Sequence, residues 1–269
     1  MIVGGANTIK TFEDAAKVFR DHEGMSVNSV REWSVQFGTQ NQQLALKILK
    51  NITYYSGATI RQMVEDLVDK VCNHLHLCDR KKILFIPIGE PYEGSAIIAR
   101  ALRSCRGIHR NQIKHQRDLA DVPPKTNIRA ILLLDVFSGT GNQILDWWTN
   151  METLLLPWKD KSIELILGVL ALNYKAARVL KTIPTTIQYT YYLDVKSDVL
   201  SKQSRAFSSS EKQQLKKFCR KTGCPSDFLY GKGNCGLLLS FRQGCPNNSL
   251  PILWFSSGEW KNIFLRRGL

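Results

Sequence analysis

The sequence lacks any apolar run of the roughly 18 residues that a membrane-spanning helix needs. The opening "MIVGGANTIK" has no basic region followed by a long apolar core, so we expect no export signal. We therefore expect a cytoplasmic protein with no membrane association. Hydrophobic residues make up 43% of the 269 residues, which excludes wholesale disorder and supports a packed core.

Cysteine pairs at zinc-knuckle spacing are absent. Four of the seven cysteines cluster near the C-terminus with the spacing C-x4-C-x10-C-x9-C: Cys219, Cys224, Cys235 and Cys245. This spacing lacks the C-x2-C pairs of most structural zinc sites, and an odd number of cysteines without an export signal argues against a disulfide framework. We expect reduced thiols in or near a core, and we assign no metal site with certainty.

Acidic residues are scarce relative to basic ones: 23 Asp and Glu against 37 Lys and Arg give a formal charge of +14. Residues 201–269 hold twelve basic and three acidic residues, a balance of +9, and a second basic stretch covers residues 103–119. This excess indicates a polyanionic partner, such as nucleic acid or a phosphate-rich ligand. A basic surface without a specific partner is the alternative. The candidates for contact with nucleic acid or a partner are Lys216, Lys217, Arg220 and Lys221, on the helix expected from "EKQQLKKFCRKTG".

The first 80 residues have helical patterns. Thr11 and Asp14 have the spacing of a capping box, and "NQQLALKILKNI" is amphipathic. In "ATIRQMVEDLVDKVCNHL", the apolar residues recur at steps of three and four, which is typical of a helix with one buried face. We therefore expect an N-terminal helical region over residues 1–80.

The pattern changes to short apolar runs that alternate with helices. The runs "ILFIP", "IRAILLLD", "IELILGVLAL" and "TIQYTYYLDV" are separated by the helices expected at "AIIARALRSC", "ILDWWTNMETLL" and "NYKAARVLKTI". Continuous apolar strands alternating with helices predict an α/β fold with a parallel sheet that is covered on both faces. This core is expected over residues 81–200.

Residues 201–269 are expected to form a basic C-terminal subdomain. "GLLLSFRQ" and "LPILWFS" are separated by the turn-rich "GCPNNS", which indicates a hairpin or a hood on the main sheet, with Pro251 on an edge strand. Trp254 and Trp260 fit core packing, with stacking on a nucleotide base as the alternative.

The run "ILLLDVFSGTGNQ" carries the features of a phosphate site. Gly139 and Gly141 allow a tight turn with open N–H groups, Ser138 and Thr140 add hydroxyl donors, and a helix begins at Asn142. The positive end of a helix beside such a turn favours a phosphate. A carboxylate would repel that phosphate, but it suits sugar hydroxyls, so we place the ribose of a ribose 5-phosphate near Asp135 and its phosphate over residues 138–142.

"ILLLDVFSGTG" resembles the signature loop of type I phosphoribosyltransferases, whose pattern has two adjacent acids where this chain has Asp135 and Val136. The resemblance implies a type I phosphoribosyltransferase-like fold in which the acid pair holds the ribose diol and stabilises positive charge on the sugar. "FIPIGEPYEGSAIIARAL" resembles the pyrophosphate loop of the same family. Its candidate residues are Gly89, Glu90, Glu93, Gly94 and Ser95.

Glu90 and Glu93 are unusual beside a pyrophosphate. Mg²⁺ would bridge carboxylate and phosphate oxygens there, or else the two side chains face solvent. In the family, a basic loop between the two site loops closes over the pyrophosphate. Here the candidates are Arg110, Lys114, His115 and Arg117, with a solvated basic loop as the alternative.

The chain ends, "REWSVQFGTQNQQLALKILKNITYYS" and "GNCGLLLSFRQGCPNNSLPILWFSSGEWKNIF", are similar to phosphoribosyltransferase-like proteins of prokaryotic conflict systems. That resemblance implies an effector, or toxin, of antiphage defence. It also implies partners such as a retron reverse transcriptase with its RNA and DNA and a winged-helix DNA-binding protein.

Two functions therefore stay open. One is an enzyme that acts at the anomeric carbon of phosphoribosyl pyrophosphate or a nucleotide, with Asp135 as the catalytic residue. The other is an inactive fold that binds a nucleotide, a nucleic acid or a protein partner, which the replacement of the second acid by Val136 favours.

Overall fold

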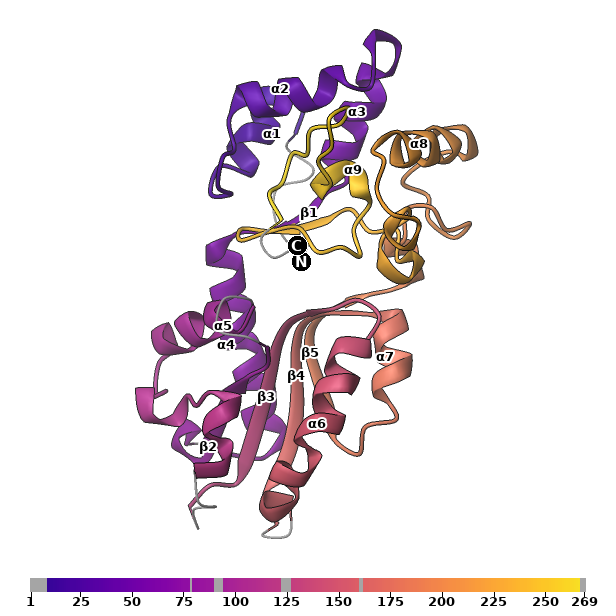
Figure 1. Ribbon diagram of the computed structural model, residues 1–269. Coiled ribbons are helices and arrows are strands. Elements are labelled where there is room, and N and C mark those ends of the chain that lie inside the picture. Colours follow the sequence, from indigo (N-terminus) through magenta and orange to yellow (C-terminus); the bar gives the residue numbers. More distant parts are fainter. Residues whose placement is uncertain (1–8, 78, 90–93, 122–126, 160–161, 267–269) are drawn as a thin grey trace. The chain divides into compact units, whose positions relative to one another are not determined.

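The computed structural model describes residues 9–77, 79–89, 94–121, 127–159 and 162–266 (Figure 1). The chain divides into two compact units. Residues 60–193 form one unit, and residues 1–59 together with 194–269 form the other. The N-terminal helical region and the basic C-terminal region, which the sequence suggests as separate, thus belong to one unit. The boundary at residues 59/60 falls inside helix α4 (Gly57–His74).

A four-stranded parallel sheet with the order β2-β3-β4-β5 forms the centre of the 60–193 unit. The apolar runs of the first three strands are buried almost throughout, whereas the edge strand β5 is half-buried along most of its length. This burial is the expected consequence of continuous apolar strands in a parallel sheet. The bounds are β2 (Ile83–Pro87), β3 (Ala130–Ser138), β4 (Glu164–Asn173) and β5 (Thr186–Leu193).

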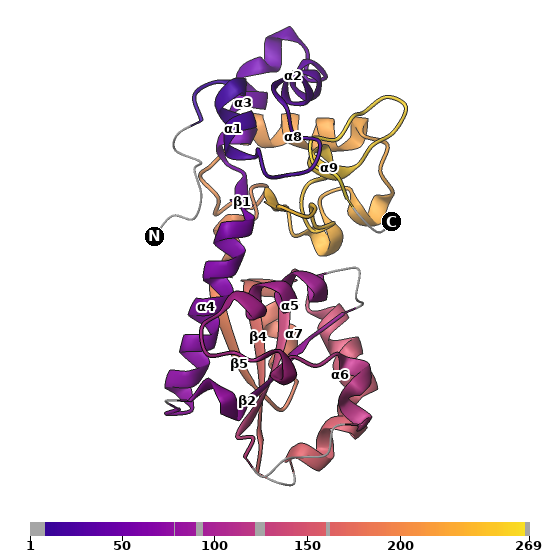
Figure 2. The same ribbon diagram turned by 90° about the vertical axis from the view of Figure 1, so that its left-hand side faces the viewer.

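Helices cover both faces of this sheet. Figures 1 and 2 show α4 and α5 (Gly94–Ser104) on one side and α6 (Asn142–Lys159) and α7 (Tyr174–Leu180) on the other. On the second side, Ile131 and Leu133 of β3 share a buried cluster with Trp148 of α6 and Leu180 of α7. The predicted α/β fold with a helix-flanked parallel sheet is confirmed.

The other unit is built from both ends of the chain. Its core contains Trp33, Phe37, Leu253, Trp260 and Phe264, all of which are almost completely buried. The capping box predicted at Thr11 is present, with Asp14 as its reciprocal partner. Its helices are α1 (Phe12–Val18), α2 (Val27–Val35), α3 (Gln42–Lys50), α8 (Ser209–Lys221) and α9 (Pro251–Trp254).

The expected C-terminal hairpin is wrong. β6 (Leu239–Phe241) pairs in parallel with β1 (Thr53–Tyr55), and residues 251–254 form the short helix α9. Pro251 suits the first turn of a helix because no acceptor is needed there for its missing N–H, so it does not mark an edge strand. Trp254 and Trp260 are 2% and 0% exposed, which confirms core packing and leaves neither ring free to stack on a base.

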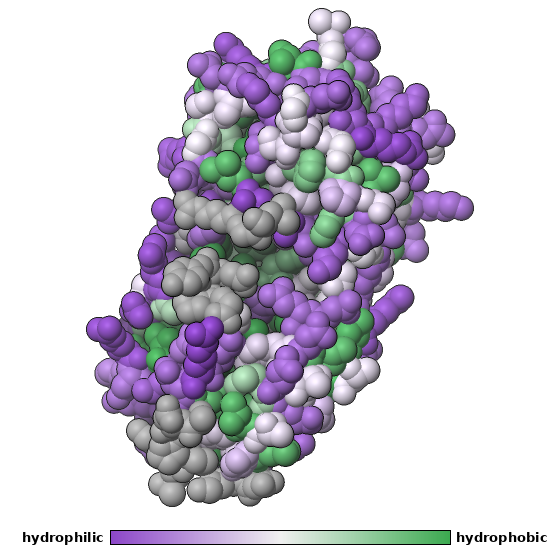
Figure 3. Space-filling view, in the orientation of Figure 1, coloured by the Kyte–Doolittle hydropathy of each residue, from purple (hydrophilic) through white to green (hydrophobic). Residues whose placement is uncertain are grey.

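Short 3-10 helices complete the connections. They are η2 (Thr39–Asn41), η3 (Arg80–Lys82), η4 (Arg110–Gln112), η5 (Gln116–Asp121), η6 (Val195–Ser197), η7 (Ser226–Phe228) and η8 (Lys232–Asn234). None of the helices in the described ranges has the length and apolar character needed to cross a membrane. On the face shown in Figure 3, hydrophilic side chains (purple) predominate, with hydrophobic ones (green) scattered among them.

Candidate functional site

Strand β3 runs farther than the sequence suggests. It continues through Asp135 to Ser138, and Asp135 and Ser138 lie opposite Val169 and Leu172 of β4. Residues 135–138 continue the strand because β4 is long enough to pair with them as well. Asp135 therefore lies inside the strand, three residues before its end, and not at the end of the strand as expected.

The turn after β3 is held tightly against α7. Gly141 has φ +87°, and a Cβ added to it would lie 3.1 Å from Cβ of Val179 and 3.2 Å from the backbone of Ala176. Only glycine combines this backbone conformation with so close an approach. The carbonyl of Gly141 accepts a hydrogen bond from the N–H of Leu145 at 3.0 Å, so α6 begins directly at the turn.

The turn presents unused donors. Among the described residues, none accepts a hydrogen bond from the backbone N–H of Thr140 or Gly141. The first N–H groups of α6, beginning at Asn142, have no acceptor within the helix either. Asn142 is exposed and Thr140 is half-buried, whereas Ser138 is only 4% exposed. A phosphate at this turn would thus meet backbone N–H groups and the Thr140 hydroxyl more readily than the Ser138 hydroxyl.

The second predicted loop follows β2. Gly89, with φ +100°, starts the turn, and Gly94 and the buried Ser95 open α5, as predicted. The N–H of Ile88 donates to the carbonyl of Leu134 at 2.7 Å, so the end of β2 is held beside β3. Glu90 and Glu93 lie outside the described residues.

The two loops meet at Asp135 and Val136. A Cβ added to Gly94 would lie 3.1 Å from Cγ2 of Val136 and 3.9 Å from Oδ1 of Asp135. Val136 is 7% exposed, so its side chain fills the contact between β3 and the first turn of α5. The residue after Asp135 is therefore a packing residue here. The same contact brings one residue of the predicted pyrophosphate loop next to the predicted ribose carboxylate.

Gln116, which the sequence analysis did not identify, joins three parts of this unit. Its Oε1 accepts hydrogen bonds from the N–H of Gly89, at 3.3 Å, and from Nε1 of Trp147 on α6. The N–H of Gly89 is thus already engaged. A single glutamine in a basic segment carries no sequence signal for such a role.

The segment around Gln116 lies along β2. Ile113 forms a parallel bridge with Phe85, and the N–H of Lys114 donates to the Phe85 carbonyl at 3.0 Å. Of the four residues predicted to close over a pyrophosphate, Arg110 and Arg117 are exposed, and Lys114 and His115 are half-buried.

Asn173 is a second polar residue missed at the strand ends. It ends β4 and is completely buried; its Oδ1 accepts the N–H of Lys175 at 2.9 Å, while its Nδ2 has no partner in the described part of the chain. A polar residue at the end of the apolar run "IELILGVLALN" repeats the pattern of Asp135 after "ILLL". That repetition is the signal that could have identified it.

The four basic residues predicted on α8 lie in the other unit, and their surroundings differ. Lys216 lies over the ring of Tyr230, with 5.7 Å from Nζ to the centroid, and Lys221 donates to the carbonyl of Gln36 at 3.2 Å. Lys217 and Arg220 are exposed. Lys216 and Lys221 thus have contacts within this unit, and the prediction that the four residues bind a nucleic acid or a partner stays a prediction.

The cysteines behave as core residues. Six cysteines in the described ranges are in no disulfide, and five of them are buried, as expected for reduced thiols. Burial and a hydrogen bond with Glu65 raise the pKa of the Cys105 thiol to about 12. In the same ranges, no three His, Cys, Asp or Glu side chains are grouped as metal ligands.

Solved structures with a similar arrangement share little sequence with the chain. A hypothetical protein from Neisseria gonorrhoeae, solved with bound ppGpp, is 16% identical, with a TM-score of 0.35, over 54% of this chain and 85% of its own. Orotate phosphoribosyltransferase from Mycobacterium tuberculosis, in complex with inorganic phosphate, is 13% identical, with a TM-score of 0.31, over 51% and 71%. Xanthine-guanine-hypoxanthine phosphoribosyltransferase from Helicobacter pylori is 14% identical, with a TM-score of 0.30, over 52% and 83%.

No curated protein matches the chain at a significant level. The model of the PRTase-CE family, in contrast, matches residues 30–266, which include both loops and most of the two units. The expected phosphoribosyltransferase-like character is thereby confirmed. The chain belongs to the PRTase-CE family.

Proposed function

We propose that the protein binds phosphoribosyl pyrophosphate or a related nucleotide at the carboxyl ends of β2 and β3 and acts at the anomeric carbon of its ribose. The observation that carries this proposal is the contact of Gly94 with Asp135 and Val136, because it joins the two predicted loops into one site. The N–H groups of Thr140 and Gly141, which have no acceptor among the described residues, lie at the end of the same strand.

Each part of the site has a distinct task in this proposal. The 139–142 turn holds the 5-phosphate through backbone N–H groups and the positive end of α6. Asp135 accepts hydrogen bonds from the ribose hydroxyls. The loop from Gly89 to Ser95 holds the pyrophosphate, and Gln116 must then release the N–H of Gly89 if that group is to contribute.

The reaction at this site is a displacement at carbon. The bond between the anomeric carbon and the pyrophosphate oxygen breaks, with its electron pair leaving on pyrophosphate, and water or another acceptor supplies the new pair and loses a proton. Positive charge develops on the sugar, and the Asp135 carboxylate stabilises it without a covalent intermediate.

Magnesium fits this site only together with its ligand. Mg²⁺ is commonly held by one or two carboxylates and by the phosphates of a substrate. In the described part of the site, Asp135 is the carboxylate that lies next to the predicted pyrophosphate loop and would hold the ion together with the phosphates. The bound ion would offset the charge of the pyrophosphate.

A second function is supported by Val136. Where the resembling families have a second acid, this chain has a buried side chain packed on α5. Without that acid, the site would bind a nucleotide and report its presence to a partner without turnover.

The biological setting we propose follows the resemblance of the chain ends. The protein would act as the toxin of an antiphage system such as a retron, held in check by a nucleoprotein complex of a reverse transcriptase, its RNA and DNA, and a winged-helix DNA-binding protein. Membership of the PRTase-CE family supports the phosphoribosyl chemistry of that effector.

Asp135→Asn separates the two functions. The amide keeps the shape and one acceptor oxygen but removes the charge, so ligand affinity should change only a few-fold. Stabilisation of the transition state should fall by about 2–4 kcal/mol, which is a loss of roughly a hundredfold in turnover. The measurements are pyrophosphate release from phosphoribosyl pyrophosphate with Mg²⁺, and growth of cells that express the protein.

Asp146→Asn is the matched control, because Asp146 is an exposed carboxylate on α6 and should tolerate the same change. An Asp135→Asn protein with unchanged turnover and toxicity would show that the site does no chemistry. Binding without turnover in the unmodified protein would favour the sensing function.

A further inference from the structure

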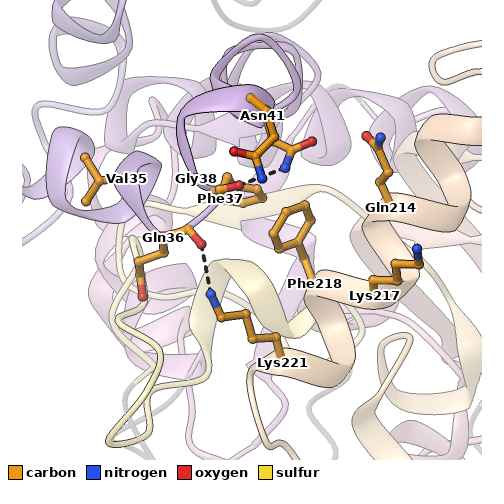
Figure 4. Close-up of a pocket in the computed structure, with 10 residues that line it drawn as sticks. Val35, Gln36, Phe37, Gly38, Asn41, Gln214, Lys217, Phe218 and Lys221 are labelled. Atoms are coloured by element: carbon orange, nitrogen blue, oxygen red, sulfur yellow. Dashed lines mark hydrogen bonds between the residues drawn. The ribbon is translucent and has the colours of Figure 1, made fainter.

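A pocket in the unit formed by the chain ends lies outside the site described above. It has a volume of about 650 Å³ and is bounded by the end of α2, the turn at residues 36–41 and one face of α8 (Figure 4). That volume is within the range of roughly 300–1,000 Å³ found for small-molecule sites. The sequence analysis did not identify it because its two walls are more than 170 residues apart in the chain.

The α8 wall follows the helical repeat. Gln214, Lys217, Phe218 and Lys221 are spaced by three and four residues, so they share one face, whereas Lys216 and Arg220 do not line the pocket. Figure 4 shows Phe218 pointing from α8 toward the opposite turn, with Lys217 and Gln214 farther along the same helix.

The opposite wall is a rigid turn. Gly38, with φ +78°, reverses the chain after α2, and its N–H donates to the Val35 carbonyl at 3.0 Å. Nδ2 of Asn41 donates to the Phe37 carbonyl at 2.9 Å. These bonds fix the wall before any ligand arrives, which lowers the entropic cost of binding.

An aromatic cluster packs behind the lining residues Phe37 and Phe218. The rings of Phe37 and Phe218 are 4.5 Å apart between centroids, and Trp260 lies 5.3 Å from Phe37. Phe37 is 2% exposed, but Phe218 is only half-buried. Phe218 therefore offers part of an aromatic ring to a ligand while the buried rings hold it in place.

The charged side chains that line the pocket are all positive. No Asp or Glu is among the described residues that line it, and Lys217 has no ion-pair or hydrogen-bond partner in the described ranges. Gln214 likewise has no hydrogen-bond partner there. The pocket thus combines a free cation, a free side-chain amide and an aromatic ring.

We infer that this pocket binds one nucleotide of a single-stranded nucleic acid. The base would stack on Phe218 and use the amide of Gln214, and the adjacent phosphate would contact Lys217. Stacking requires an exposed base face, which a single strand offers and a duplex does not. An acidic peptide would use the lysines but not the ring, and a free nucleotide would lose the additional charge contacts of the strand. The inference does not depend on the proposed function.

The test is fluorescence anisotropy of a labelled oligo(dT) of about 15 nucleotides, a length comparable to the larger known single-strand sites. Lys217→Gln should weaken binding about tenfold and reduce the slope of log affinity against log salt by about 0.7, the contribution of one phosphate contact on a single strand. Phe218→Leu keeps apolar volume but removes the ring, and should weaken binding about tenfold without changing that slope.

Arg220→Gln is the matched control, since it removes one charge from the same helix outside the pocket. It should change affinity less than about threefold. Asp135→Asn should bind the oligonucleotide like the unmodified protein, so failure of this inference and failure of the proposed function are distinguishable.

Three results would overturn the inference. Equal losses for Lys217→Gln and Arg220→Gln would show diffuse attraction, and full affinity of Phe218→Leu would show that no base stacks there. Equal affinity for a duplex, for dTMP alone or for a poly-glutamate peptide would identify a different ligand class.

Photo-crosslinking of the unmodified protein avoids variants that fail to fold. An oligonucleotide containing 5-iodouracil should crosslink within residues 36–41 or 214–221. Crosslinks confined to other segments would contradict the inference.

Discussion

At the scale of single residues, the site depends on two close contacts that leave no room for a side chain. Gly94 lies against Val136, and Gly141 lies against α7. Neither contact follows from the composition of the loops alone, since each depends on a separate element of the unit, β3 for Gly94 and α7 for Gly141.

Gly141→Ala should destabilise the protein more than a positive φ alone explains. Gly141 and Gly223 both have positive φ, but a Cβ at Gly223 would meet nothing within 4 Å, whereas one at Gly141 meets Val179 and Ala176. We expect Gly223→Ala to lower the free energy of unfolding by about 1 kcal/mol, and Gly141→Ala by about 2–4 kcal/mol because steric displacement of α7 is added. Urea denaturation measures both, and equal losses would argue against the contact.

Val136→Asp restores the acid pair of the resembling families but places a carboxylate in a buried contact. The melting temperature at neutral pH should fall, because burial disfavours the charged form, although the positive end of α5 offsets part of this cost. Burial raises the pKa of such a group above its unfolded value, so the loss should shrink as pH falls toward 5. Val136→Asn, which does not titrate, is the control and should show no such recovery. A variant as stable as the parent protein would show that position 136 tolerates the acid.

At the scale of secondary-structure elements, most of the fold could be predicted. The alternation of apolar runs and helices defined β2 to β5 and the helices between them, because buried parallel strands leave a clear pattern. The pairing of β1 with β6 could not be predicted, because the partners Thr53 and Leu239 are far apart in sequence and each strand has only three residues. For α9, a four-residue apolar segment fits a strand or a helix equally well, and tertiary packing decides.

The candidate site, like the fold, has parts that could be predicted from the sequence and parts that could not. The turn at Gly139–Gly141 and the start of α5 were predictable, because glycines and a following helix are visible in the sequence. The role of Val136, the Gln116 bridge and the α8 pocket were not, because each arises where separate segments meet.

The connection between α4 and β2 depends on Arg80. Its Nη1 lies 2.6 Å from Oε1 of Glu65 and 2.7 Å from the Arg106 carbonyl, and its Nη2 contacts Asp69. Burial alone would raise the pKa of Glu65, but hydrogen bonds from Cys105 and Arg80 outweigh it, so this pKa is lowered. A carboxyl whose folded pKa lies below its unfolded value adds stability above that unfolded value and loses it as pH falls through the folded pKa.

Glu65→Gln should therefore cost about 1 kcal/mol of unfolding free energy at pH 7, and the difference from the parent protein should shrink below about pH 4. Urea denaturation at several pH values measures this. Glu152→Gln on α6, where Glu152 is exposed, should have almost no effect at any pH. A pH-independent loss for Glu65→Gln would indicate that shape, not charge, matters at this position.

At the scale of the whole molecule, each unit has its own core. Leu253 and Leu167 are both completely buried, one in each hydrophobic cluster. We expect two calorimetric transitions, since separate cores are the usual basis of separate cooperative units.

Leu253→Ala and Leu167→Ala should each remove about 2–5 kcal/mol from one unit and shift a different transition. Scanning calorimetry of the two variants measures this directly. A single transition that both substitutions lower equally would show that the units unfold as one.

The central claim is that the carboxyl ends of β2 and β3 bind a phosphoribosyl group. Calorimetric titration of the full chain with phosphoribosyl pyrophosphate and Mg²⁺ tests it most directly. We predict saturable binding near one ligand per chain, competition by ribose 5-phosphate, and a loss of at least tenfold in affinity for Thr140→Pro, which removes an N–H from the turn. Absence of binding heat, or full affinity in the Thr140→Pro protein with its fold intact, would contradict the account.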